Sequence, residues 1–232
     1  MCRIPVLLTL MLVPVVVISA EPASSPAGAA AKVSQELLRS RNPSLKLTWL
    51  KPQSSIAPVT RIMLAPTEFG YRDVKPFYGT SMAYSSRTEF PVSEENRGRL
   101  AKVVAEVFRE ELAKNKHVQL TTEAGPGVLL IKTSLLDIVS RVPPEPPGRS
   151  EVYVDSVGDA TLLLEFADAT TGEPLARAAD RRTAEPGLGI GGFGAVRAVA
   201  PTVWEEVRRL AHRWGRTMDG RIDEIYFATK PK

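Results

Sequence analysis

The residues best able to perform chemistry are few and widely spaced. The only cysteine is Cys2, and the two histidines, His117 and His212, do not form an H-x-x-x-H pair. Zinc sites are normally built from such pairs or from cysteine thiolates. Neither a G-x-S-x-G motif nor a phosphate-binding P-loop motif occurs. We therefore expect no metal, no other cofactor, no catalytic residues and no enzymatic activity.

One glycine-rich run formally matches a nucleotide-binding motif. Residues 187–192 read Gly-Leu-Gly-Ile-Gly-Gly, which has the spacing G-x-G-x-x-G. In a dinucleotide site this motif joins a strand directly to a helix inside a β-α-β unit, whereas here the next expected helix begins about ten residues later. The run is therefore interpreted as a loop. Gly189, Gly191, Gly192 and Phe193 are candidate partner-binding residues within it.

Carboxylates are the remaining candidates for acid–base chemistry, because several lie on or beside predicted strands. They are Asp137, Asp155, Asp159, Glu165 and Asp168. A catalytic role requires two of them to converge in a cleft. Such residues are mostly exposed in folded proteins, so turn and surface roles are favoured.

A long aperiodic segment, residues 67–92, gathers aromatic side chains. Aromatic residues in a long loop either form a recognition surface or cap the end of a core, and we favour the second interpretation. Under the first interpretation the candidate partner-binding residues are Tyr71, Phe77, Tyr78 and Tyr84.

The first twenty residues are typical of a secretory signal. Arg3 supplies a positive start, residues 4–18 are almost all apolar, and Ala20 is a small residue ahead of an expected cut before Glu21. An apolar run of about fifteen residues is too short to span a hydrocarbon core of roughly 30 Å. We therefore expect residues 1–20 to be removed on export, which places the protein in the periplasm or the cell envelope.

Three further segments are expected after the signal. Residues 21–44 are rich in Ala, Ser and Pro and are typical of a flexible tether. Residues 45–227 carry the periodic patterns of one domain, and residues 228–232 form a tail. Because Cys2 stands before the apolar run and leaves with the signal, we expect no disulfide and no lipidated cysteine. Membrane association by another route stays open.

The charge balance argues against a nucleic-acid partner. Without Arg3, the 30 basic residues become 29 against 26 acidic ones, a net charge near +3. Nucleic-acid binding normally needs a clustered basic face. The charge is compatible with an envelope protein or polymer as partner, and it indicates nothing about oligomeric state.

Hydrophobic periodicity predicts five strands and two helices. The strands are expected at 61–66, 117–122, 128–142, 151–167 and 174–183, and the helices at 93–115 and 202–225. The alternation of Leu45, Leu47 and Trp49 indicates either an edge strand or a loop. The predicted fold class is α+β, a mainly antiparallel five-stranded sheet with two helices packed on one face.

Local signals mark the ends of several of these elements. Ser93 is the expected N-cap of the first helix, and Thr202 with Glu205 forms the S/T-x-x-E capping box of the second. Between the last two strands, Asp168 and Gly172 supply the chemistry of a tight turn, which predicts an antiparallel hairpin.

Several of these stretches resemble a family of bacterial envelope lipoproteins, the domain of unknown function numbered 3313. The matching residues are Gly125–Leu129, Val157–Ala160, Asp168–Ala176, Asp180–Arg182, Trp204 and Trp214. The resemblance covers about residues 45–225 and implies an exported, envelope-associated protein without an established reaction. The chain departs from the family pattern by lacking the acylated cysteine.

These observations lead to two functional expectations. The first is a non-enzymatic envelope protein that binds another protein or a polymer through the exposed sheet face and the segments 67–92 and 184–200. The alternative is a periplasmic carrier, in which the sheet and the helices enclose an apolar pocket for a small ligand or a lipid.

Overall fold

The computed structural model describes residues 46–75, 88–144, 152–185 and 195–230. The expected signal (1–20) and tether (21–44) lie outside the described residues, and so do the cleavage residues Ala20 and Glu21. Seven of the eight candidate partner-binding residues also lie outside them: Phe77, Tyr78, Tyr84, Gly189, Gly191, Gly192 and Phe193. Among the described residues, no helix is both long enough and apolar enough to cross a membrane.

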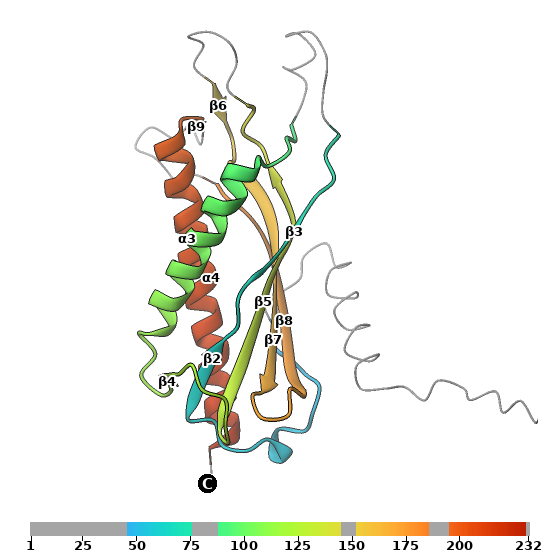
Figure 1. The fold of residues 1–232 in the computed structure, drawn as a ribbon, viewed down its shortest axis with the longest axis vertical. Helices are drawn as coiled ribbons and strands as arrows, with labels where there is room; N and C mark the ends of the chain where they lie inside the picture. The colour runs from blue at the N-terminus through green and yellow to red at the C-terminus, as the bar shows by residue number, and fades with distance from the viewer. Residues whose placement is uncertain (1–45, 76–87, 145–151, 186–194, 231–232) are drawn as a thin grey trace, which may run out of the picture.

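The described chain forms two layers, a twisted mixed sheet and a pair of helices on one of its faces (Figure 1). The sheet has seven strands, in the order β1-β8-β7-β5-β2-β4, with β3 pairing to β5 beside that path. The strands are β1 (Thr48–Trp49), β2 (Arg61–Leu64), β3 (Glu68–Tyr71), β4 (Gln119–Leu120), β5 (Val128–Ser140), β7 (Gly158–Asp168) and β8 (Pro174–Thr183). A separate pair is formed by β6 (Tyr153–Val154) and β9 (Val196–Arg197).

The α+β class is confirmed, but the prediction of five antiparallel strands is wrong. β2 runs parallel to both β4 and β5, and β3 also runs parallel to β5. The parallel direction of β2 and β5 follows from the helix α3 (Glu94–Leu112), which lies between them in the sequence. The helix returns the chain to the end of the sheet where β2 begins. A crossover of this kind makes the strands that it joins parallel.

The second half of the sheet matches the sequence prediction closely. β5, β7 and β8 pair antiparallel, with Leu162 opposite Leu135 and Leu164 opposite Thr133. Gly172 adopts φ +72° in the predicted turn, and the Asp168 carboxylate accepts the backbone N–H of Thr170 at 2.8 Å. The hairpin is therefore confirmed together with the chemistry of its turn.

Two short strands differ from the sequence expectation, and a third decides between two alternatives that the sequence left open. The segment 67–92 was expected to lack regular structure, but it contains β3, which pairs by its backbone with the long strand β5. The expected strand at 151–167 is two strands, β6 and β7. The segment near Trp49 is a two-residue edge strand. Strands this short carry too few residues for a visible period, so tertiary pairing decides them.

The two helices begin with different caps. The Ser93 hydroxyl accepts the backbone N–H of Asn96 at 3.4 Å, which confirms the predicted N-cap of α3. Helix α4 (Ala200–Thr229) begins earlier than predicted, at an N-cap formed by Val199 without a side-chain hydrogen bond. Because Pro201 fits the first turn of a helix, the chain becomes helical before Thr202, and the predicted capping box does not form.

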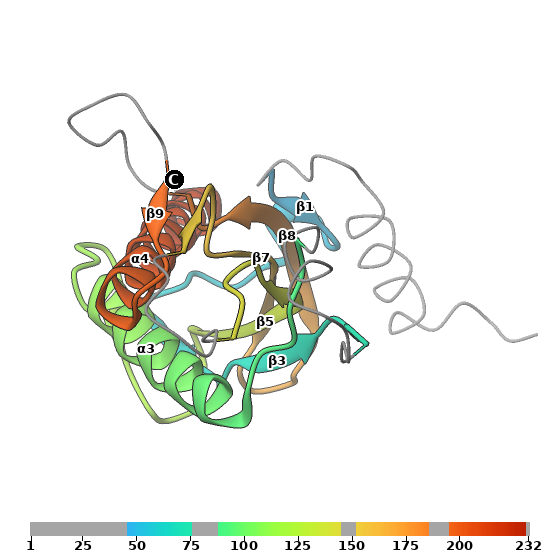
Figure 2. The same cartoon turned by 90° about the horizontal axis from the view of Figure 1, so that it is seen from above.

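Both helices begin at the same end of the molecule and run side by side over one face of the sheet (Figures 1 and 2). Contacts from Glu106 to Arg208 and from Asn115 to Asp219 fix this parallel register. Phe108, Phe166 and Ile222 are among the fully buried residues between the layers. Figure 2 shows the sheet curving around the helices.

Candidate functional site

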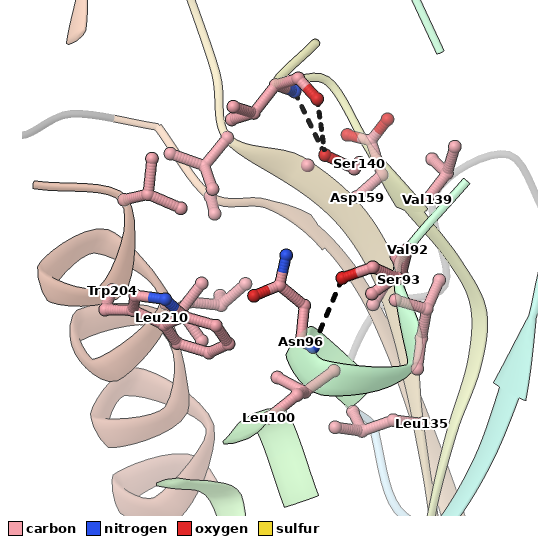
Figure 3. Close-up of a pocket in the computed structure, with 18 of the residues that line it drawn as sticks. Val92, Ser93, Asn96, Leu100, Leu135, Val139, Ser140, Asp159, Trp204 and Leu210 are labelled. Atoms are coloured by element: carbon pink, nitrogen blue, oxygen red, sulfur yellow. Dashed lines mark hydrogen bonds between the residues drawn. The ribbon is translucent and has the colours of Figure 1, made fainter. Parts of the chain in front are cut away.

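A cavity of about 580 Å³ opens between the helices and the sheet, at the end where both helices begin. Its walls come from the first turns of α3 and α4, the end of β5 and the start of β7 (Figure 3). Most of the lining side chains are apolar: Pro91, Val92, Leu100, Val104, Leu135, Ile138, Val139, Val142, Val157, Val203, Trp204, Val207, Leu210 and Trp214.

Small residues explain why this end of the core is hollow. Five lining residues are alanines, whose side chain is a single methyl group: Ala160, Ala184, Ala198, Ala200 and Ala211. Farther along the same layers, Phe108, Phe166 and Met218 fill the corresponding space. The alanines therefore leave open space between the helices and the sheet at this end.

The deep wall of the cavity is part of the protein core. Val104, Leu135 and Leu210 are almost inaccessible to solvent. Trp214 is also buried, and its indole N–H donates to the Asp180 carboxylate at 3.1 Å. Because this bond satisfies the polar atom of Trp214, the ring can contribute its apolar surface to the wall without leaving a buried donor unpaired.

Polar groups lie at the rim. The Ser140 hydroxyl donates to the Val142 carbonyl at 3.1 Å, and Asp159 accepts from the Arg141 guanidinium at 2.6 Å and from the Thr183 hydroxyl at 2.7 Å. In Figure 3 the Asn96 side chain projects into the space between Trp204 and Ser140. The cavity therefore has an apolar interior and a polar rim.

Four of the five candidate carboxylates bind partners other than one another. Asp137 is held by Arg72, Asp159 by Arg141, and Glu165 by Lys132 and Arg177. Asp168 binds backbone groups of its turn, and Asp155 lies exposed at a bend.

Two pKa shifts agree with these contacts. Hydrogen bonds from Arg72 hold the pKa of Asp137 below its usual value, against the opposing effect of burial. Burial raises the pKa of Glu165, but the bonds from Lys132 and Arg177 outweigh it and lower the pKa. A general acid near neutral pH needs the opposite shift.

Sequence reasoning missed a second group of ionisable side chains, at the contact between α3 and α4. Ligand atoms of Glu110, Glu111 and His212 lie within 4.8 Å of one another. The Lys114 ammonium already contacts both carboxylates, at 3.0 Å and 2.9 Å, and His212 Nδ1 lies 2.8 Å from Glu111 Oε1. Burial raises the pKa of Glu111, but its bonds to Lys114 and His212 lower it overall. This arrangement is an ion-pair cluster in which the Lys114 ammonium is the cation shared by Glu110 and Glu111.

Tyr71 is the only candidate partner-binding residue that the structure describes. It ends β3, and the Arg97 guanidinium lies 4.4 Å from the centre of its ring. Burial raises the pKa of its hydroxyl. Tyr71 does not line the cavity. Of the residues that the sequence singled out for chemistry, only Asp159 lines the cavity. The apolar lining residues come from segments far apart in the sequence, so they give no local signal.

Comparison with known proteins gives a family but no activity. A model for proteins of unknown function (DUF3313) matches residues 32–203, more than half of the chain. This match confirms the resemblance seen in the sequence, without bearing on lipid attachment. No curated protein matches the chain.

Solved structures give only distant likenesses. A PelC dodecamer from Paraburkholderia phytofirmans has 8% identity and a TM-score of 0.34, over 76% of this chain and 96% of that one. The hypothetical protein CT253 from Chlamydia trachomatis has 8% identity and a TM-score of 0.35, over 73% and 99%. Protein XCC0632 from Xanthomonas campestris has 10% identity and a TM-score of 0.32, over 78% and 96%. Likenesses this low support no inference about what this chain binds.

Proposed function

Since the chain belongs to the DUF3313 family, whose description names no activity, we propose a function from the cavity itself: the protein binds a small apolar ligand, such as one lipid chain, between its helices and its sheet. We propose further that it is exported, acts in the cell envelope and catalyses no reaction. Lipid chains are abundant in that compartment, and a binding protein there needs only a pocket that excludes water from them.

The observation that carries this proposal is the apolar cavity. Its volume of about 580 Å³ lies inside the range of about 300–1,000 Å³ that is usual for small-molecule sites. Transfer of apolar surface from water stabilises a complex by about 25 cal/mol per Å² before the costs of association. An apolar wall with polar groups only at the rim is the arrangement that suits a ligand with an apolar body.

The absence of an enzymatic role is proposed from the state of the rim groups. Asp159 is the buried carboxylate of the lining, and Arg141 and Thr183 occupy both of its oxygens. Both oxygens of this carboxylate therefore already have partners within the chain itself. The rim is therefore suited to orienting a ligand rather than to transforming it.

Filling the cavity tests the proposal. Leu100 is a half-buried lining residue on α3, and Ala105 is exposed on the same helix outside the cavity. We expect the uncharged fluorophore N-phenyl-1-naphthylamine to bind the wild-type protein saturably. Leu100→Trp should weaken its binding about tenfold or more, because the larger ring occupies the cavity, whereas Ala105→Trp should not.

Native mass spectrometry of the protein purified from its own envelope provides a second readout. A lipid-sized mass should accompany the wild type and the Ala105→Trp variant, and should be reduced in the Leu100→Trp variant. Absence of saturable fluorophore binding to folded wild-type protein, or equal binding by all three proteins, would overturn the proposal.

A second candidate function is contact with another envelope protein or a polymer. It is favoured by a cluster of rings at the opposite end of the helices, where His117, Tyr226 and Phe227 contact one another with ring centres 5.0–5.2 Å apart. Phe227 is 58% exposed, so this cluster presents aromatic surface to solvent. A photoreactive phenylalanine at position 227 should crosslink to one reproducible partner in intact cells, and the same residue at exposed position 105 should not.

A further inference from the structure

Strand β3 is an open edge of the sheet. Among the described residues its only strand partner is β5, and none of its four residues is buried. It offers a longer edge than β1 and β4, the strands at the two ends of the strand order, which have two residues each. The unpaired backbone groups of an edge strand are a template for another extended segment.

The backbone groups of Phe69 and Tyr71 point outward from this edge. The Arg72 N–H donates to the Ile138 carbonyl of β5 at 2.9 Å. Successive residues of a strand turn their N–H and C=O groups to opposite edges, so Phe69 and Tyr71 turn theirs away from β5. Each of them therefore offers one donor and one acceptor to an incoming strand.

The sequence of this edge is complementary to itself. Residues 68–72 read Glu-Phe-Gly-Tyr-Arg. When two copies pair antiparallel with Gly70 opposite Gly70, the outward-pointing residues Phe69 and Tyr71 form the hydrogen-bonded pairs, and Glu68 lies opposite Arg72. A register centred on Tyr71 instead would place Phe69 opposite Asp73 and lose both matches.

The two charged residues are positioned for this contact. Glu68 and Arg72 lie on the same face of the strand, because they are an even number of residues apart. Glu68 is exposed, and its carboxylate accepts from the Ser134 hydroxyl at 3.1 Å. Asp137 and Glu89 hold the Arg72 guanidinium in place, and this group has further N–H donors to offer.

On these grounds we propose that the protein forms a two-fold symmetric dimer in which two sheets join edge to edge through β3, with Gly70 at the centre. The partner is a second copy, because one short segment supplies both halves of every contact, as a two-fold interface requires. Glycine at the centre suits the close approach of a pair that exchanges no hydrogen bonds. No residue of β3 lines the cavity, so the inference goes beyond the proposed function and is independent of it.

Charge reversal tests the dimer. We expect sedimentation equilibrium to show a monomer–dimer equilibrium of the wild-type protein at concentrations up to about 1 mM, the range of weak complexes. Glu68→Lys should weaken self-association about fivefold or more, because two attractive charge pairs become repulsive. Glu123→Lys is the matched control, since Glu123 is exposed, lies outside β3 and undergoes the same change of charge; it should associate as wild type does.

A mixture of two variants separates this contact from a general loss of stability. Arg72→Glu, confirmed as folded by circular dichroism, should also self-associate poorly. Mixed with Glu68→Lys, it should form a heterodimer about as tight as the wild-type dimer. In that heterodimer the introduced lysine lies opposite the introduced glutamate, and Arg72 of one variant lies opposite Glu68 of the other.

A disulfide provides a readout that does not require the Arg72 variant. Residues opposite each other in a non-hydrogen-bonded pair have Cα atoms about 4.5 Å apart, within the range that a disulfide bridges. Gly70→Cys in a Cys2→Ser background should therefore give a covalent dimer on mild oxidation, and Glu123→Cys in the same background should not. The nearest neighbour of the added Cβ is the end of the Leu136 side chain, at 3.0 Å.

Three outcomes would contradict the inference. The first is a wild-type protein that stays monomeric over the whole concentration range, as it would if β3 served only a different protein. The second is Glu68→Lys that associates as strongly as Glu123→Lys. The third is a dimer that does not crosslink through Gly70→Cys, because its contact then lies on another surface.

Discussion

At the scale of single residues, Asp137 shows how charge and backbone geometry support each other. It lies where the pairing of β5 with β7 shifts register, and its φ of +56° is in the left-handed region that aspartate tolerates better than most residues. Its carboxylate accepts from Arg72 Nε at 2.8 Å and contacts Arg181 at 3.2 Å. The two arginines come from segments far from β5 in sequence, so the carboxylate ties three parts of the sheet together.

Acid should weaken the sheet through this residue. The Arg72 hydrogen bonds lower the folded-state pKa of Asp137 below its ordinary 3.8. A lowered folded pKa adds stability that is fully present above about pH 4 and is lost as pH falls through the folded value. Asp137→Asn should therefore lower the free energy of unfolding at pH 7 by less than about 1 kcal/mol, since the pair is partly exposed and screened.

The measurement is urea unfolding at neutral pH and at about pH 3, compared between wild type and variant. The difference between the two proteins should shrink at the lower pH, because below the ordinary pKa of 3.8 the carboxylate of the unfolded wild-type chain takes up a proton, which stabilises the unfolded state. Asp155→Asn, at an exposed bend, is the control and should behave as wild type. A difference that is the same at both pH values would contradict the argument.

At the scale of elements, the contact between α3 and α4 depends on one glycine. A Cβ placed on Gly215 would lie 2.7 Å from Glu111 Cγ and 2.9 Å from Glu111 Cβ, closer than carbon atoms pack. The absent side chain therefore lets α4 approach α3 closely enough for His212 to reach Glu111. Gly220, one turn and a half farther along α4, has nothing within 4 Å of the same position.

These two glycines predict opposite effects of one substitution. Gly215→Ala should lower the free energy of unfolding by about 1–3 kcal/mol, because the methyl group forces the helices apart. Gly220→Ala should raise it by about 0.5–1 kcal/mol, because alanine is the better helix former and meets no neighbour. Thermal and urea unfolding of the two variants measure both. If Gly215→Ala proves as stable as Gly220→Ala, the helices do not pack as closely as described.

At the scale of the whole molecule, the cavity results from the order in which the elements follow one another. The crossover through α3 makes β2 and β5 parallel, and α4 then covers the same face in the same direction as α3. Both helices therefore begin beside the end of β5 and the start of β7, where the cavity opens. One site is assembled from segments that are distant in the sequence.

Export is a prediction about the whole chain. If residues 1–20 are a cleaved signal, the mature protein begins at Glu21, and intact mass spectrometry of the periplasmic fraction should find that species. The same spectra should show whether a lipid mass is bound, as the proposed function requires. Recovery of the uncleaved chain from the cytoplasm of its native host would contradict export.

The sequence by itself determined the elements whose signals are local or periodic. The apolar positions of α3, the cap at Ser93, the alternation in β7 and the turn at Gly172 were all predictable, because each depends on neighbours within a few residues. The family was also recognisable from short stretches of sequence. These features need no knowledge of how distant segments meet.

Only the tertiary structure decided the direction of β2, the short strands β1 and β3, and the cavity. Each depends on contacts between residues far apart in the chain, for which the sequence carries no local period. Asp159 illustrates the limit, because its residue type marked it as a candidate for chemistry, while the fold gave it Arg141 and Thr183 as partners and a position at the rim of an apolar cavity. Residue types can be counted along a chain, but a site exists only where folding brings them together in space.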